Sequence, residues 1–302
     1  MKIQGRGLPF SHHQSSCSNR IPKNFTWTKE ESEIQLWMDL AIPYGAQEVR
    51  KEGIKKYGWF CESKAILPPL QDAFDNPSIL EEIVDAYDGI FTCDRELVNK
   101  HEKIHFCLAG SNLPWIPEKD YKIYDKSEFG SFIASSKIYT EGHKFRHKLY
   151  NNLKVRSEGH NIVHLFGGIS NNMFGVKKGC HLLGYKGNDW NDKSEALNDF
   201  MFSIVIENDQ YDDYFTEKIT DCFATGTIPV YYGTKNIGNY FNTDGIIEIP
   251  NDETLVDFII TNRLNKDLYY SKMDAIEDNL ERVKNMQLAD DMLFDKIQEL
   301  DS

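Results

Sequence analysis

Hydrophobic positions along this chain alternate between short, nearly unbroken apolar runs and longer stretches with a helical period. The run Phe200–Ile206 is typical of a central strand in a parallel sheet, because both faces of such a strand are covered. A helical pattern follows, in which Ile219, Cys222 and Phe223 share one apolar face. Residues 227–232 then form a second strand pattern. The segment therefore predicts a strand–helix–strand unit.

The same alternation runs through both halves of the chain. We expect strands at 57–61, 89–93, 104–109, 131–135, 162–166 and 246–249, and helices at 79–87, 142–153, 252–262 and 268–300. Residues 1–30 are rich in Gly, Ser, His and Pro and are interpreted as loop, and the polar stretch 117–128 as a linker. The alternation predicts an α/β fold of two parallel-sheet domains, residues 1–125 and 126–302.

Composition narrows the class of protein. The chain has 302 residues, 40% of them hydrophobic, which suits two globular domains. Its net charge of −13 argues against nucleic acid as the main partner. It has no apolar stretch long enough to span a membrane and no signal peptide at its start, so a cytoplasmic protein is expected. The six cysteines are scattered and are expected to be reduced.

Polar residues gather at the end of the strand at 200–206. Glu207 and Asn208 follow it directly, at the carboxyl end where ligands bind in open α/β sheets. Thr216 is placed to cap the next helix, and Lys218 lies in its first turn. A helix N-terminus and an ammonium group suit an anionic ligand such as phosphate, although a lysine in that position can also be simply solvated.

The segment resembles the donor-binding motif of the α-1,3-fucosyltransferases, glycosyltransferase family 10. The matching residues are Glu207, Asn208, Tyr214, Thr216, Glu217, Lys218, Gly226, Pro229, Val230 and Gly233. Asp209 stands where the family usually has Ser, and Phe215 where it has Ile or Val. Ser135 and Arg146 resemble the Ser…Arg element of the family, and residues 59–63 resemble its Glu-Ser element near the acceptor site.

The resemblance implies a GT-B architecture, in which two Rossmann-like domains face a cleft. It implies an inverting glycosyltransferase that moves fucose from GDP-fucose to a hydroxyl of a glycan, with an acceptor-side domain at 1–125 and a donor-binding domain at 126–302. It implies Glu62 as the catalytic base and no cofactor. The implied donor-binding residues are Ser135, Arg146, Glu207, Asn208, Tyr214, Thr216, Glu217 and Lys218.

Each of these residues also has a plainer interpretation. Glu62 ends an apolar stretch, where partial desolvation would raise the pKa of its carboxyl and suit a base, but it can also be an ordinary loop glutamate. Asp94 is the next candidate for the base. Arg146 can belong to a solvated basic helix, Glu217 can act as a capping carboxylate, and Tyr214 can be a packing residue.

No metal is expected. His12-His13 and Asp212-Asp213 lack partners at ligand spacing. Two rival functions remain open, namely a GT-B transferase that uses another nucleotide sugar, and a glycan- or nucleotide-binding protein without turnover. The acceptor, the linkage and the oligomeric state do not follow from the sequence.

Overall fold

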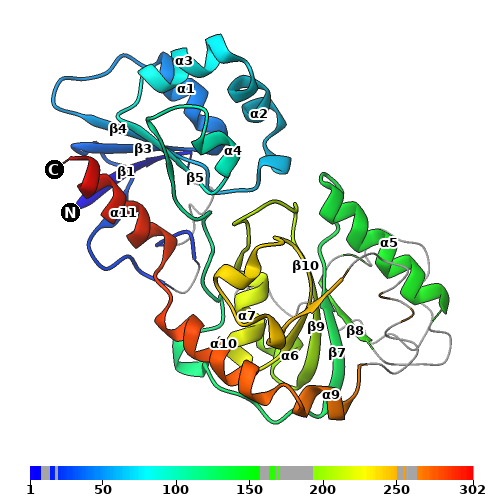
Figure 1. The fold of residues 1–302 in the computed structure, drawn as a ribbon. Coiled ribbons are helices and arrows are strands. Elements are labelled where there is room, and N and C mark those ends of the chain that lie inside the picture. Colours follow the sequence, from blue (N-terminus) through cyan, green and yellow to red (C-terminus); the bar gives the residue numbers. More distant parts are fainter. Residues whose placement is uncertain are drawn as a thin grey trace. The chain divides into compact units, whose positions relative to one another are not determined.

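The chain forms two compact units. The computed structural model describes residues 1–7, 14–17, 20–156, 163–167, 169, 193–249, 255, 257 and 264–301. Unit 1 comprises Met1–Leu113, Tyr211–Thr216 and Gln287–Ser302, and unit 2 comprises Pro114–Gln210 and Glu217–Met286 (Figure 1). Each is an α/β unit built on one parallel sheet, which confirms the predicted fold class.

The two units do not coincide with the domains expected from the sequence, residues 1–125 and 126–302. Two segments from the second half of the chain, Tyr211–Thr216 and Gln287–Ser302, pack within unit 1. The second of these carries the buried Asp290, whose carboxylate accepts hydrogen bonds from the Ser16 amide and the Trp27 indole. The acceptor and donor roles of the two halves remain predictions.

Unit 1 is built on six parallel strands in the order β2-β1-β3-β4-β5-β6. The strands are β1 (Lys2–Arg6), β2 (Thr26–Thr28), β3 (Ile34–Met38), β4 (Lys55–Trp59), β5 (Gly89–Thr92) and β6 (Ile104–Phe106). Met38 pairs with Trp59 and Trp59 with Phe91, so β3, β4 and β5 end at the same edge of the sheet. The loops that follow these strands therefore leave from one edge.

Helices cover both faces of this sheet. They are α1 (Ile42–Gln47), α2 (Pro68–Asp75), α3 (Pro77–Asp85), α4 (Arg95–Val98) and α11 (Ala289–Leu300). Ile90 on β5 belongs to the core formed with α1, α2 and α3. The neighbouring Gly89 faces Leu300 of α11 instead, because side chains alternate between the two faces of a strand. Figure 1 shows α1–α3 and α11 on opposite sides.

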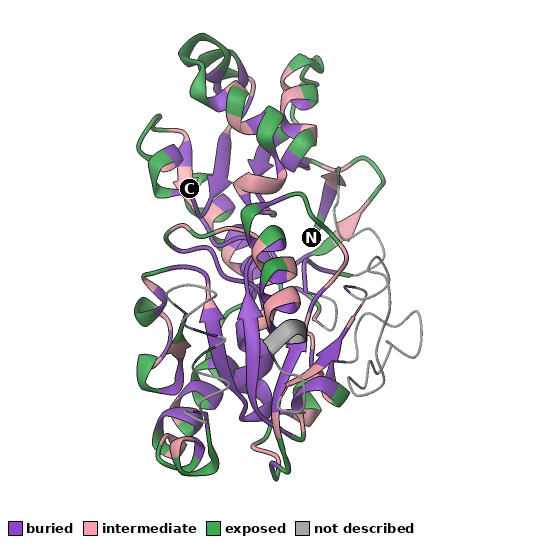
Figure 2. Cartoon of the chain, turned by 90° about the vertical axis from the view of Figure 1, so that its right-hand side faces the viewer, coloured by how far each residue is buried: buried purple, intermediate pink, exposed green. Residues whose placement is uncertain are grey.

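Unit 2 is built on five parallel strands in the order β11-β10-β9-β7-β8. The strands are β7 (Glu128–Ile133), β8 (Val163–Phe166), β9 (Phe200–Ile206), β10 (Ile228–Tyr232) and β11 (Ile247–Glu248), and the helices are α5 (Glu141–Arg156), α6 (Ser194–Leu197), α7 (Glu217–Thr225), α9 (Lys266–Tyr270) and α10 (Met273–Asn285). All seven residues of β9 are buried, which confirms the predicted central strand. Figure 2 shows that the strands of the chain are mostly buried. In Figure 1, α5 lies on one side of the sheet and α6, α7 and α10 on the other.

The ends of α7 agree with the sequence pattern. The helix begins at Glu217, directly after Thr216. Gly226 follows its last residue with a φ of +70°, the left-handed conformation expected of a glycine at a helix C-terminus. A side chain on Gly226 would also press on the backbone of Ile123.

The prediction that residues 1–30 form a loop was wrong, because this segment contains β1 and β2. The next strand, β3, was also not predicted. These strands were hidden by polar residues such as Gln4 and Gln35, which are buried because their amide groups hydrogen-bond to one another between β1 and β3. Satisfied polar side chains of this kind break the apolar run from which a buried strand is recognised.

Two helix predictions also needed correction. The helix expected at 79–87 is α3, which begins at Pro77 with Asn76 as its cap and is preceded by the unexpected α2. The stretch 268–300 is divided into α9, α10 and α11. The helix expected at 252–262 lies largely outside the described residues.

No helix in the described ranges is both long and apolar enough to cross a membrane. The five cysteines among those residues are buried free thiols, as predicted, and Cys180 lies outside them.

Candidate active site

In unit 2 the carboxyl end of β9 places a buried carboxylate beside an ammonium group. Glu207 follows the strand, has no exposed surface, and donates its amide to the Tyr232 carbonyl at 2.8 Å. Its Oε2 lies 3.0 Å from Lys218 Nζ. A buried carboxylate without a partner would cost several kcal/mol, roughly, so the pairing with Lys218 stabilises Glu207 in this position.

Lys218 lies in the first turn of α7, where the helix dipole alone would disfavour a cation. Two carboxylates offset this. Glu207 is one, and Glu217, the first residue of the helix, places Oε1 at 3.8 Å from the ammonium. The Lys218 side chain is 26% exposed. Its ammonium group is therefore paired with carboxylates and still accessible to solvent.

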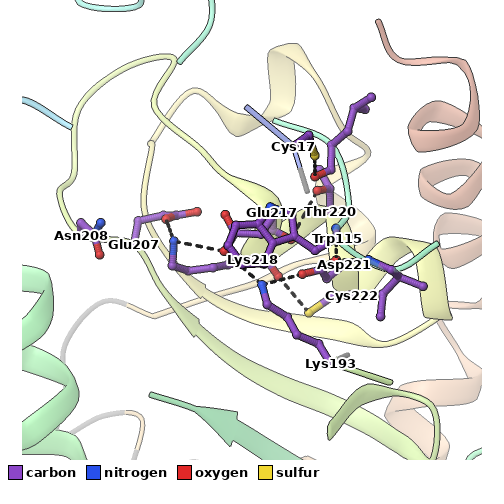
Figure 3. Close-up of polar contacts among 12 residues, drawn as sticks. Cys17, Trp115, Lys193, Glu207, Asn208, Glu217, Lys218, Thr220, Asp221 and Cys222 are labelled. Carbon is purple, nitrogen blue, oxygen red and sulfur yellow. Dashed lines mark hydrogen bonds and ion pairs between the residues drawn. The ribbon is translucent and has the colours of Figure 1, made fainter. Parts of the chain in front are cut away.

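A second lysine, Lys193, completes this network. Its ammonium is buried, 3.0 Å from Glu217 Oε1 and 2.7 Å from Asp221 Oδ2 (Figure 3). It also lies 4.7 Å from the centre of the Trp115 ring. Burial raises the pKa of the Asp221 carboxyl, and the Lys193 charge opposes that rise. Lys193 was not predicted from the sequence, because it lies 24 residues before Glu217 in a polar stretch without a strand or helix signal.

Asp221 ties the network to a separate part of unit 2. Its Oδ1 accepts hydrogen bonds from the amides of Trp115 at 2.7 Å and Ile116 at 3.0 Å. The N-terminal turns of α7 are therefore fixed by Lys193 and by the backbone at 115–116. Glu217 and Lys218 are presented from a rigid support.

The N-terminal part of α5 packs on the same strand end. Arg146 is buried and donates from Nε and Nη2 to the Ile206 carbonyl, and from Nη2 to Asn208 Oδ1 at 3.0 Å. The Gly142 amide donates to the Asn208 carbonyl at 3.3 Å. A Cβ on Gly142 would lie 1.9 Å from the Glu207 carbonyl oxygen, so only glycine fits there. The sequence analysis did not identify this role of Gly142.

The charges around β9 and α7 balance formally. The carboxylates of Glu207, Glu217 and Asp221 pair with the ammonium groups of Lys193 and Lys218, and Arg146, bonded to the Ile206 carbonyl and to Asn208, adds a third positive charge. Nearby His143 adds no charge at neutral pH, because burial, helped by the positive charge of Arg146, lowers its pKa to about 4. An anionic ligand here would share the cations with carboxylates already in place.

Three other predicted donor residues are placed differently. Ser135 follows β7 in unit 2 and accepts a long hydrogen bond of 3.4 Å from the Lys137 amide. Tyr214 and Thr216 belong to unit 1. The Tyr214 ring is buried, stacks on Tyr211 at 5.0 Å, and packs against Cys93 and Ala109. These contacts fit the packing interpretation of Tyr214.

Glu62, the predicted base, lies in unit 1 three residues after the end of β4. Its side chain is partly exposed, and its amide donates to Asp39 Oδ1 at 3.1 Å. The same oxygen accepts the Cys61 amide at 2.9 Å. Asp39 was not identified from the sequence, because the strand that it follows, β3, was itself missed. It lies at the sheet edge from which Glu62 also emerges.

Asp94, the reserve candidate for the base, has both carboxylate oxygens engaged. Oδ1 accepts the Glu96 amide at 3.0 Å at the start of α4, and Oδ2 lies 3.1 Å from Lys64 Nζ. These bonds indicate a structural role, which leaves Glu62 as the stronger candidate.

Within the described ranges, no group of three His, Cys, Asp or Glu side chains could hold a metal ion. His12 and His13 lie outside those ranges. Of the Asp212-Asp213 pair, Asp213 binds Arg95 at 2.7 Å.

Comparison with protein families gives one match that spans half of the chain. The family model "Glycosyltransferase family 10 (fucosyltransferase) C-term" matches residues 125–276. That range contains β9, α7 and the polar network around them.

Among curated proteins, the alpha-(1,3)-fucosyltransferase FucT of Helicobacter pylori is 30% identical over 90 residues, which is 29% of this chain and 18% of that protein. The putative fucosyltransferase R654 of Acanthamoeba polyphaga mimivirus is 28% identical over 101 residues, 28% of this chain and 17% of that protein. Each alignment thus spans less than a fifth of the relative.

Solved structures resemble the chain over almost its whole length. A crystal structure of an alpha1,3-fucosyltransferase with GDP-fucose aligns with a TM-score of 0.51 at 16% identity, over 94% of this chain and 89% of that one. OtsA in its apo form aligns with a TM-score of 0.58 at 11% identity, over 90% and 74%. At these identities the likeness concerns the fold alone, which is that of the GT-B glycosyltransferases.

Proposed function

The chain belongs to glycosyltransferase family 10, the fucosyltransferase family, and we propose that it moves fucose from GDP-fucose to a hydroxyl of a glycan acceptor. The observation that carries the proposal is the Lys218 ammonium in the first turn of α7, beside the strand-end carboxylate of Glu207. The chain covers only a small part of its curated relatives, so the activity is our proposal for this protein.

The proposed donor site lies in unit 2. Lys218 and the N-terminus of α7 meet the diphosphate of GDP, whose leaving oxygen gains negative charge during transfer. Glu217, held by Lys193, accepts hydrogen bonds from the ribose hydroxyls. Arg146 fixes the Ile206 carbonyl and Asn208, and so supports the residues that face the sugar and diphosphate.

The proposed base lies in unit 1. The Glu62 carboxylate takes the proton from the acceptor hydroxyl while the acceptor oxygen forms a bond to fucose C1. The bond from C1 to the phosphate oxygen breaks, and its electron pair leaves with GDP. Attack on the face opposite the leaving group makes the transfer inverting.

The proposal needs neither a cofactor nor a divalent metal, because Lys218 and the α7 N-terminus supply positive charge to the diphosphate. Turnover should therefore persist in EDTA. Activity that disappears with EDTA and returns with Mn²⁺ would overturn this part of the proposal.

Two assays distinguish the rival functions. The melting temperature, measured with GDP, UDP, ADP and CMP at millimolar concentrations, should rise most with GDP. Hydrolysis of GDP-fucose without acceptor then distinguishes an enzyme from a protein that only binds. A larger shift with another nucleotide indicates a transferase with a different donor, and a GDP shift without hydrolysis or transfer indicates binding alone.

A further inference from the structure

The loop that carries Glu62 is anchored by a second acidic residue, Asp39. The Asp39 side chain is 6% exposed, and its Oδ1 accepts both the Cys61 amide, at 2.9 Å, and the Glu62 amide, at 3.1 Å. One carboxylate oxygen thus fixes two consecutive peptide units. The second of these belongs to the proposed base.

Two further observations show that this arrangement is costly for the fold. The other oxygen of Asp39, Oδ2, is buried without a hydrogen-bond partner among the described residues. The Asp39 backbone has a φ of +49°, in the left-handed region that few residues other than glycine, asparagine and aspartate adopt. A buried unpaired oxygen and a left-handed backbone each cost of order 1–3 kcal/mol and tend to occur at functional sites.

We propose that Asp39 is a positioning residue for catalysis, which holds the Cys61–Glu62 backbone and places a second carboxyl group beside that of Glu62. The proposal rests on the function proposed above, in which Glu62 is the base. Asp39 has no role in the reaction as proposed above.

The electrostatics follow from this geometry. Burial, with the Glu62 charge as the second cause, raises the pKa of Asp39 to about 7. Among the described residues, the Cys61 thiol also lies near Asp39. Burial raises the pKa of this thiol well above its usual value, and the charges of Asp39, Glu62 and Asp290 on α11 add to the rise. As the pH rises through about 7, Asp39 ionises and its charge makes the Glu62 carboxylate more basic.

Asp39→Asn is the informative substitution. Asparagine tolerates the left-handed backbone and keeps a carbonyl oxygen for the two amides, but it cannot ionise. We expect kcat to fall by roughly two- to tenfold above pH 7, where Asp39 is ionised in the wild type, and to change little at pH 5.5, with KM nearly unchanged. Asp39→Gly keeps the backbone but loses the anchor, so the amide hydrogens of Cys61 and Glu62 should exchange faster with solvent.

The direct test is an NMR titration of ¹³C-labelled glutamate side chains, with the Glu62 signal assigned by its absence in Glu62→Gln. The proposal predicts that the Glu62 carboxyl signal of the wild type shows a second step near pH 7, as Asp39 ionises, and that this step is absent in Asp39→Asn. A wild-type Glu62 signal without that step, or unchanged amide exchange in Asp39→Gly, would overturn it. Full activity of Glu62→Gln would instead refute the base assignment, and the titration would still measure the coupling.

Discussion

Lys218 Nζ lies 3.0 Å from Oε2 of Glu207, a residue without exposed surface. This pair joins the carboxyl end of β9 to the first turn of α7. The lysine therefore has two functions in our account, since it neutralises a buried carboxylate and offers positive charge to a diphosphate. Substitutions can separate the two.

Lys218→Ala should lower the melting temperature without ligand and also reduce the GDP-induced shift. Removing the ammonium takes a hydrogen-bond donor and a positive charge from the buried Glu207 carboxylate, at a cost of about 1–3 kcal/mol. Losing a charge-assisted contact to phosphate should weaken GDP binding by roughly 10- to 100-fold. Thermal unfolding with and without GDP measures both effects.

The double variant Lys218→Ala/Glu207→Gln serves as the control. The glutamine removes the negative charge at position 207, so the ligand-free melting temperature should recover while GDP binding stays weak. If GDP binding recovers together with stability, Lys218 does not bind the donor.

Glu62→Gln should lower kcat by roughly 10²–10⁴-fold, because glutamine keeps the shape of the side chain but cannot accept the acceptor proton. GDP affinity should barely change, since Lys218 and Glu217, which are proposed to bind the diphosphate and the ribose, lie in unit 2. Steady-state rates and GDP titrations measure these quantities. The exposed Glu52 provides a matched control, Glu52→Gln, which should behave as wild type. Transfer at the wild-type rate by Glu62→Gln, with chemistry limiting kcat, would refute the assignment.

Gly142→Ala should destabilise the protein, although glycine to alanine in an open helix is usually stabilising by about 1 kcal/mol. The new methyl group would overlap the Glu207 carbonyl oxygen and push α5 away from the end of β9. We expect lower stability in urea and a smaller GDP shift. In the control Gly238→Ala, the new Cβ would meet only Thr243 Cγ2, at 3.2 Å, so near-wild-type behaviour is expected. A stabilised Gly142→Ala would contradict the packing described here.

Asp39→Asn should gain stability relative to the wild type as the pH rises from 5 to 8. The pKa of Asp39 is 3.8 as a free side chain and about 7 in the fold. The unfolded state therefore binds fewer protons between these values, and wild-type stability falls over that window, by about 4 kcal/mol at most. The stability of the Asp39→Asn variant should not fall in this way, because asparagine does not ionise. Urea unfolding at both pH values measures it, with the exposed Asp72→Asn as control. An equal stability difference at pH 5 and pH 8 would contradict the burial of an ionisable Asp39.

The parts of the site that were found from the sequence depend on short-range patterns. Residues 200–206 show an apolar run, and Glu207, Glu217 and Lys218 follow within twelve residues of it, at a strand end and a helix start. The structure brings these three side chains together. Because β9 and β10 are parallel, the connecting helix α7 begins at the sheet edge where β9 ends.

The parts that were missed depend on contacts between distant segments. Lys193 reaches Glu217 and Asp221 from a stretch without periodicity, and Asp39 meets Glu62 from the neighbouring strand. Nothing local in the sequence marks either residue as a partner. Tyr214 shows the reverse case, since a motif position alone did not reveal that its ring is buried against Tyr211 in unit 1.

The most direct test of the account is a transfer assay with GDP-fucose and an array of glycan acceptors, followed by NMR of the isolated product. We predict a fucosylated glycan whose new linkage has the anomeric configuration opposite to that of the donor, and loss of this product in Glu62→Gln and Lys218→Ala. Transfer from a different nucleotide sugar, or a product that retains the donor configuration, would contradict the proposed reaction.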